Sequence, residues 1–258
     1  MENDNKGSPG YGDKKEITII AATGVAVTLC VCCLLGVAGY FLYKDLGTPK
    51  PTPTSKPTQA VRSPLPTQSA NSKVFFSDTF DSNANGWNEG TTKDDYGTIT
   101  YTINGNYTWD VTANKAVNQK SWASRAPEVG DLVASVDATH VSGAENASYG
   151  IVFRVKDTNN LYYFCISDSG YYYVGLLKDG TWTTLIDWKE INTLNINGLN
   201  KLKVIGKGDE FTFFVNDKQV DQITDGSYPE GTAGLAIELY EAGDQSTFIF
   251  DNFNLTTP

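Results

Sequence analysis

Residues 161–177, LYYFCISDSGYYYVGLL, have the spacing in this sequence that most suggests ligand chemistry. The Asp-Ser-Gly in their middle is typical of a three-residue hairpin loop with glycine in the left-handed position. That register pairs Ser167 with Tyr171 and Cys165 with Tyr173. We prefer it to a register shifted by one residue, because it leaves one face wholly apolar or aromatic. That face consists of Tyr162, Phe164, Ile166, Tyr172, Val174 and Leu176.

The opposite face of this hairpin carries Tyr163, Tyr171 and Tyr173, and the preceding strand, YGIVFRV, adds Arg154 to the same side. Flat aromatic rings stack on the apolar face of a pyranose, and a guanidinium donates hydrogen bonds to sugar hydroxyls. We therefore predict an open groove in which these four residues bind a carbohydrate. A competing interpretation stays open, in which the tyrosines pair across strands and cover this face against loops.

The tryptophans are interpreted mainly as packing residues. Trp182 and Trp188 share an alternation with Thr184 and Ile186, which favours the core for both. The KDG before them could form a two- or a three-residue loop, so the face of Trp182 stays open. Trp87 and Trp109 are expected to pack there as well.

Catalytic and metal-binding chemistry has little support in the sequence. His140 is the only histidine, and we expect it to be a solvated residue beside a turn. One histidine and one cysteine, Cys165, in the folded part argue strongly against zinc, and no Gly-x-Ser-x-Gly elbow is present for a serine nucleophile. Calcium has no fixed signature outside the EF-hand. Asp78, Asp81 and Asp251, near the first and last predicted strands, are the candidates for a structural calcium, and no other cofactor is expected.

The chain from residue 74 onward has the pattern of an all-β domain. Short runs such as TITYTI, YGIVFRV, KLKVIG, FTFFVN and GLAIELY alternate with turn signals such as DTNN, KDG, NDK and EAGD. No stretch there has sustained helical periodicity. This pattern predicts a β-sandwich or barrel over residues 74–258. The segment is long enough to bury a core without a disulfide.

Residues 17–43, ITIIAATGVAVTLCVCCLLGVAGYFLY, form 27 consecutive positions without a charge. A helix needs about 20 apolar residues to cross a bilayer. Signal-peptide hydrophobic regions are only about 7–15 residues long. We therefore predict an uncleaved, single-span membrane anchor. Residues 1–16 precede it as a short polar tail, for which we expect disorder and a cytoplasmic location.

Residues 44–73 contain six of the ten prolines together with many threonines and serines, which predicts an extended linker. Basic residues do not decide the orientation, because three precede the span and four follow it in the linker before residue 73. A stalk that lifts a domain off a membrane makes most sense facing outward. We therefore expect a single-pass protein of the cell membrane whose C-terminal domain is extracytoplasmic.

The predicted domain is strongly acidic. Residues 74–258 contain 12 basic and 25 acidic residues, a net charge of 12 − 25 = −13. Such a surface repels phosphate polymers, so nucleic acid is not expected as a partner.

Three parts of the domain resemble concanavalin A-like lectin/glucanase domains, and among these the 3-keto-disaccharide-hydrolase-like domains of bacterial surface proteins. They are FFSDTFDSNANGW near the start, YGIVFRVKDTNNLYYFCISDSGYYYVGLLKDGTWTTLIDW in the middle, and NKLKVIGKGDEFTFFVNDKQV with GTAGLAIELYEAGDQSTFIFDNFNL at the end. The resemblance implies a two-sheet antiparallel jelly-roll sandwich with its first strand beside its last. It also implies that any ligand site lies on the concave sheet.

One departure from that resemblance matters for function. Glucanases of this fold carry Glu-x-Asp-x-(x)-Glu on one strand, which places a nucleophile and an acid on one face. No Glu of residues 74–258 is followed by Asp two positions later. The glucanase mechanism therefore does not carry over, and an enzyme is disfavoured.

Three functional hypotheses follow. The favoured one is a membrane-anchored, non-catalytic recognition module that binds a glycan. The second is a structural ectodomain, or one that binds a surface protein. The third is a glycoside hydrolase of the 3-keto-disaccharide type, which would require two carboxylates about 5–9.5 Å apart.

Overall fold

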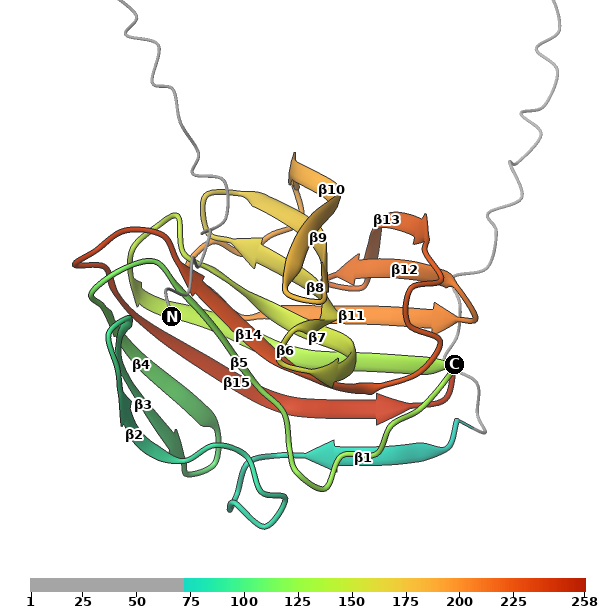
Figure 1. Cartoon of the computed structure of the whole chain (residues 1–258), viewed down its shortest axis with the longest axis horizontal. Coiled ribbons are helices and arrows are strands. Elements are labelled where there is room, and N and C mark those ends of the chain that lie inside the picture. The colour runs from blue at the N-terminus through green and yellow to red at the C-terminus, as the bar shows by residue number, and fades with distance from the viewer. Residues whose placement is uncertain (1–71) are drawn as a thin grey trace, which may run out of the picture. The chain divides into compact units, whose positions relative to one another are not determined.

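The computed structural model describes residues 72–258, which form fifteen β-strands and no helix (Figure 1). The all-β prediction is confirmed for this part of the chain. The predicted tail (1–16), membrane span (17–43) and all but the last two residues of the linker (44–73) lie outside the described residues. Within residues 72–258, no helix is available to cross a membrane.

The strands form two antiparallel sheets. The larger sheet has nine strands in the order β13-β12-β11-β6-β15-β4-β3-β2, with β1 also paired to β15. Its strands are β1 (Val74–Asp78), β2 (Gly90–Lys93), β3 (Gly97–Ile103), β4 (Tyr107–Ala113), β6 (Leu132–Gly143), β11 (Asn200–Lys207), β12 (Glu210–Val215), β13 (Lys218–Thr224) and β15 (Gln245–Thr256).

The smaller sheet has six strands in the order β10-β9-β8-β7-β14-β5. They are β5 (Val117–Ser121), β7 (Ser148–Asp157), β8 (Asn160–Ser167), β9 (Tyr171–Lys178), β10 (Thr181–Glu190) and β14 (Thr232–Leu239). The two sheets pack as a sandwich, as the resemblance implied.

The first and last strands lie side by side, as predicted. β1 pairs with β15 from Val74↔Thr256 to Asp78↔Phe253. Just before β1, the Lys73 backbone N–H donates to Thr257 Oγ1 (2.9 Å), and the Thr257 N–H donates back to the Lys73 carbonyl (2.9 Å). The two ends of the described domain therefore meet on the nine-stranded sheet.

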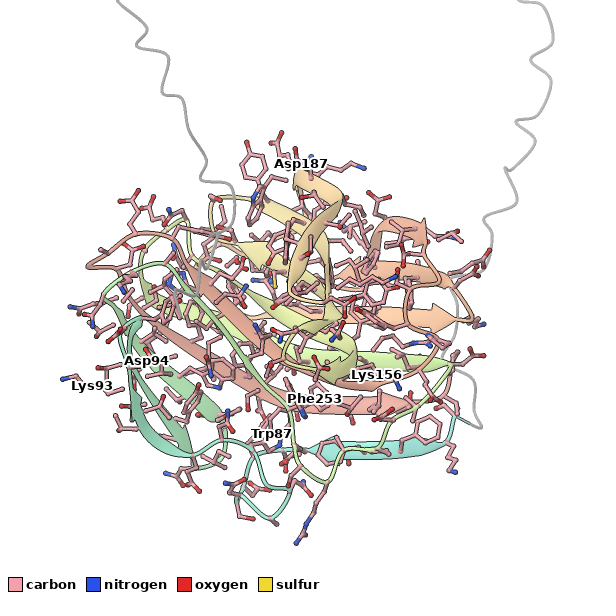
Figure 2. All side chains as sticks on the ribbon, viewed as in Figure 1. Trp87, Lys93, Asp94, Lys156, Asp187 and Phe253 are labelled. Carbon is pink, nitrogen blue, oxygen red and sulfur yellow. The ribbon has the colours of Figure 1, made fainter. Side chains whose placement is uncertain are left out.

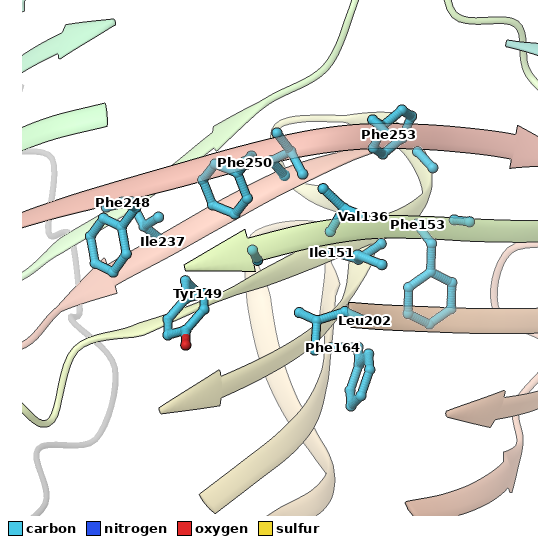
Figure 3. Packing of buried hydrophobic residues seen from close by; sticks show 14 of the residues in the cluster. Val136, Tyr149, Ile151, Phe153, Phe164, Leu202, Ile237, Phe248, Phe250 and Phe253 are labelled. Atoms are coloured by element: carbon cyan, nitrogen blue, oxygen red, sulfur yellow. The ribbon is translucent and has the colours of Figure 1, made fainter. Parts of the chain in front are cut away.

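The main core lies between the sheets. Phe248, Phe250 and Phe253 of β15 face Tyr149 and Phe153 of β7 across it (Figure 3). All five side chains are fully buried, and burying an aromatic side chain of this size is worth about 2–3 kcal/mol.

β15 keeps its three phenylalanines inward through an irregularity. Strict alternation after Phe248 and Phe250 would place Phe253 on the opposite face. The register with β6 shifts between Asp251 and Asn254, and Asn252 adopts a left-handed conformation (φ 51°). This β-bulge returns Phe253 to the core.

The hairpin between β8 and β9 has the predicted register. Ser167 pairs with Tyr171 and Cys165 pairs with Tyr173. Gly170 is left-handed (φ 93°), and its N–H donates to the Ser167 carbonyl (2.9 Å). The two faces of this ribbon are therefore those that the sequence predicted.

A buried carboxylate ties β1 to the loop that follows it. Asp78, 7% exposed, accepts hydrogen bonds from Trp87 Nε1 (2.8 Å), Asn85 Nδ2 (2.7 Å) and the Phe80 N–H (2.8 Å). Trp87 packs edge-on against Phe253 with a centroid distance of 5.3 Å (Figure 2). The predicted packing role of Trp87 is confirmed, as is that of Trp109, which is fully buried.

Replacing Asp78 by Ala should destabilise the domain by about 3 kcal/mol, because it leaves three polar N–H donors without their acceptor at a buried site. The measurement is urea unfolding of the full-length chain. Asp81→Ala is the matched control: this carboxylate accepts only an exposed bond from Thr79 Oγ1, so its removal should cost less than about 0.5 kcal/mol. Equal losses in the two variants would contradict this account of the β1 corner.

Candidate functional site

The outer face of the six-stranded sheet, away from the other sheet, carries a row of polar residues across five strands. Neighbours in the row are paired in the sheet registers. The row consists of Tyr171 (β9), Ser167 (β8), Ser148 (β7), Glu238 (β14) and Asn118 (β5). We refer to it as the polar row.

Tyr163 and Tyr173 lie on this same outer face, as predicted. They belong to a second apolar cluster, with Val152, Cys165 and Ala236, that is separate from the core between the sheets. However, Tyr163 is fully buried and Tyr173 is only 4% exposed. They are therefore not open to stack on a ligand.

Both tyrosines are buried because their side chains extend across the sheet. The Tyr173 hydroxyl reaches Glu238 (2.7 Å), past strands β8 and β7. The Tyr163 hydroxyl reaches Asn118 (3.0 Å), past β7 and β14. Small residues on the crossed strands, such as Gly150 and Ala236, leave room for this arrangement.

Two tryptophans of β10 cover these tyrosines, which corrects the prediction that both point into the core. The Trp182 ring lies 5.2 Å from that of Tyr163 and 5.8 Å from that of Tyr173. It occupies the space above Gly175, where an added Cβ would come within 2.3 Å of the indole. Trp188 packs edge-on against Tyr173 at 4.6 Å and remains 39% exposed. Register shifts in β10 break the simple alternation on which the prediction rested.

Arg154 does not share this face, contrary to the prediction. It is left-handed (φ 51°), and the pairing of β7 with β8 shifts after Phe153, so Arg154 is the extra residue of a β-bulge. Its fully buried guanidinium lies over the Phe211 ring of the main core (5.5 Å). It donates to the carbonyls of Gly208 (3.1 Å) and Tyr228 (3.4 Å). Arg154 thus holds two loops together.

The structure therefore does not bring the four predicted residues together in an open groove. Among them only Tyr171, 40% exposed, presents its ring to solvent. Two further aromatic residues are exposed to a similar degree, Trp188 on β10 and Tyr240 just after β14, each at 39%.

Glu238 is the centre of the site and was missed from the sequence. Its Oε2 accepts hydrogen bonds from the hydroxyls of Tyr173 (2.7 Å), Tyr240 (2.8 Å) and Ser148 (3.0 Å). Its Oε1 accepts from Asn118 Nδ2. The signal was a single charge inside the otherwise apolar strand sequence GLAIEL, where a carboxylate has to find donors.

The electrostatics of the site follow from this carboxylate and from burial. Burial first, and then the charge of Glu238, raise the pKa of Tyr163 and Tyr240 well above the usual range. The pKa of Tyr173 is raised too, by burial most of all. Burial lowers the pKa of Lys120, and Glu238 opposes that shift. The tyrosine hydroxyls therefore stay protonated and act as donors to Glu238.

The predicted calcium ligands are not gathered into a site. Both carboxylate oxygens of Asp78 already accept bonds from protein donors, and Asp81 accepts one from Thr79. Asp251 accepts a bond from the Asn252 N–H. Across residues 72–258, no group of three or more His, Cys, Asp or Glu side chains is arranged to hold a metal ion.

His140 is buried rather than solvated, because it lies inside the twelve-residue strand β6. It is 3% exposed and stacks on Phe248 at 4.9 Å. Its Nδ1 lies 3.3 Å from Asp168 Oδ2, and Asp168 Oδ1 accepts from the Tyr149 hydroxyl (2.9 Å). These contacts anchor the β8–β9 turn to the core.

Two depressions lie on the outer face of the nine-stranded sheet. The larger, of about 380 Å³, is lined mainly by hydroxyl and amide side chains of β3, β4, β6 and β15, with Asp110. The smaller, of about 200 Å³, lies over β11, β12 and β13. We place the candidate site on the six-stranded sheet instead, because exposed aromatic rings gather there around an ordered carboxylate.

Comparison with known proteins supports the fold. No protein-family model and no curated sequence matches the chain. The chain is similar in structure to a GlcNAcα1-4Gal-releasing endo-β-galactosidase from Clostridium perfringens (TM-score 0.53, 12% identity, 76% of this chain and 65% of that one). It is also similar to an endo-β-1,3-glucanase from Pyrococcus furiosus (TM-score 0.51, 8% identity, 72% and 94%).

A carbohydrate-binding module from Bacillus subtilis aligns with a TM-score of 0.49 at 19% identity, over 67% of this chain and 96% of that one. The endo-β-galactosidase and the endo-β-1,3-glucanase, both with a TM-score above 0.5, show that residues 72–258 share the β-sandwich fold of those hydrolases. This is consistent with the concanavalin A-like resemblance.

The buried tyrosines should make the domain sensitive to alkali. Their pKa is raised in the folded state, so the stability they contribute is present below the unfolded-state pKa of about 10 and is lost as pH rises above it. At pH 11 each should cost about 1.4 kcal/mol of unfolding free energy. The unfolding free energy of the wild type should therefore fall between pH 8 and pH 11 by about 3 kcal/mol more than that of the double variant Tyr163→Phe/Tyr173→Phe.

Urea unfolding at the two pH values measures this difference. Between pH 6 and pH 9 the difference in unfolding free energy between wild type and the double variant should stay constant, which serves as the control. Parallel pH profiles up to pH 11 would contradict the burial of these hydroxyls.

Proposed function

We propose that residues 72–258 form a non-catalytic carbohydrate-recognition module whose binding surface is the polar row and its exposed aromatic residues. The observation that carries this proposal is the placement of Tyr171, Trp188 and Tyr240, each about 40% exposed, around the Glu238 network. Exposed rings supply stacking area for a pyranose, and ordered polar groups fix its orientation. The shared fold of two glycan-cleaving enzymes agrees with this proposal.

The arrangement of carboxylates favours binding over hydrolysis. A glycosidase needs two carboxyl groups about 5–9.5 Å apart. The other carboxylate aligned with the polar row is Glu190, which pairs with Tyr171. Four strand spacings separate it from Glu238, about 19 Å at roughly 4.8 Å each. Glu238 therefore serves as an organiser of hydroxyl groups rather than as one of a catalytic pair.

The proposal includes the anchor and linker expected from the sequence. Residues 17–43 would hold the chain in the cell membrane, and residues 44–73 would carry the module outward. Thirty residues of extended chain reach up to about 90 Å. A module on such a tether can reach a glycan on its own cell surface or on a neighbouring surface.

Trp188→Ala should weaken binding to a responsive glycan at least tenfold, because removing a stacking ring takes away both apolar area and ring geometry. The test is a glycan array followed by titration calorimetry with the full-length chain in a polyoxyethylene detergent, which has no sugar headgroups. Tyr171→Ala should act in the same direction with a smaller effect.

The matched control is Tyr96→Ala, which removes a similarly exposed ring (44%) in the turn between β2 and β3 on the other sheet. The affinity of the Tyr96→Ala variant for the same glycan should stay within twofold of the wild-type value. An array without any glycan signal would overturn the proposal and favour the partner-protein alternative. Cleavage of a bound oligosaccharide would favour the hydrolase alternative.

A further inference from the structure

We infer that the polar row recognises glycans that carry a free amino group, in preference to neutral or N-acetylated ones. The inference rests on the proposed function and follows from where the hydroxyl protons of the site point. A tyrosine hydroxyl has one proton to donate and lone pairs that accept. Once its proton is committed to the protein, only the accepting side is left for a ligand.

The protons at the centre of the site are already committed. Those of Tyr173 and Tyr240 both go to Glu238 Oε2 (2.7 and 2.8 Å), since an ionised carboxylate only accepts. Ser148 Oγ lies 3.0 Å from the same oxygen and 3.0 Å from the Tyr240 hydroxyl. The Tyr163 proton goes to Asn118 Oδ1 (3.0 Å).

The hydroxyl oxygen of Tyr240 is therefore left as an acceptor next to the Glu238 carboxylate. Tyr240 is 39% exposed, and its hydroxyl has given its proton to Glu238 (2.8 Å), which leaves its lone pairs to accept from a ligand. The face of an aromatic ring is also electronegative and attracts a cation, as the exposed ring of Trp188 can. A ligand with a protonated amine can donate to the Tyr240 oxygen and bring a positive charge next to Glu238, whereas a carboxylated sugar would be repelled there.

Among residues 72–258, Lys120 is a cation next to this network: the charge of Glu238 opposes the lowering of the Lys120 pKa by burial, so Lys120 offsets part of that charge from the β5 side. Its Nζ donates to Asn118 Oδ1 (2.9 Å) and lies 5.7 Å from the Tyr163 ring centre. Lys120 belongs to β5, which is one edge strand of the six-stranded sheet. Trp188 belongs to β10, which is the opposite edge strand. The rest of the domain is acidic, which adds to the preference for a cationic ligand.

The test compares two trisaccharides that differ only at nitrogen, the β-1,4 glucosamine trimer and its N-acetylated counterpart. Titration calorimetry on the full-length chain at pH 6, in the same sugar-free detergent, should show about tenfold tighter binding of the glucosamine trimer, because hydrogen bonds to an ammonium are charge-assisted. Glu238→Gln should reduce that preference to about twofold or less. Tyr240→Phe, which removes only the hydroxyl and keeps the ring, should reduce that preference in part.

The matched control for charge is Glu210→Gln, which removes one exposed carboxylate from β12 on the other sheet and should keep the full preference. Equal affinity of the wild type for the two trimers would overturn the inference while leaving the proposed function in place. An equal loss of preference in Glu238→Gln and Glu210→Gln would also overturn it, since the acidity of the whole domain would then be the cause. Absence of binding to any glycan would remove the proposed function itself.

Discussion

The six-stranded sheet has apolar and aromatic side chains on both of its faces, and each face has to be shielded from water. The nine-stranded sheet covers one face and forms the main core. No second layer of strands covers the other within residues 72–258, so the sheet shields it with its own side chains. Tyr163 and Tyr173 reach across neighbouring strands, and Trp182 lies on top of them. This self-coverage determines which parts of the face remain for a ligand.

The hydrogen bonding of Glu238 follows from the same need to shield this face from water. A carboxylate on a face covered by aromatic rings has to be hydrogen-bonded, and four side chains donate to it. These bonds fix the hydroxyls of Tyr173 and Tyr240 in one orientation. The result is an ordered set of side chains with exposed rings at its edge, and the proposed glycan recognition rests on this order.

The two ends of the described domain lie together, on the sheet that does not carry the candidate site. The chain enters at Ser72 beside its own C-terminus, on the β1–β15 side of the nine-stranded sheet. The candidate site lies on the other sheet.

The resemblance to concanavalin A-like domains implied the pairing of the first strand with the last. The sequence by itself determined the all-β class, the β8–β9 hairpin and the face on which Tyr163 and Tyr173 lie. These depend on alternation, turn residues and glycine, all of which are local. Only the tertiary structure decided what those side chains contact. A bulge turned Arg154 to the opposite face, and register shifts in β10 brought Trp182 and Trp188 to the outer one. Donors from three other strands, and from Tyr240 just after β14, converged on Glu238. Such outcomes depend on the strands that become neighbours, and the spacing of residues along one strand does not contain that information.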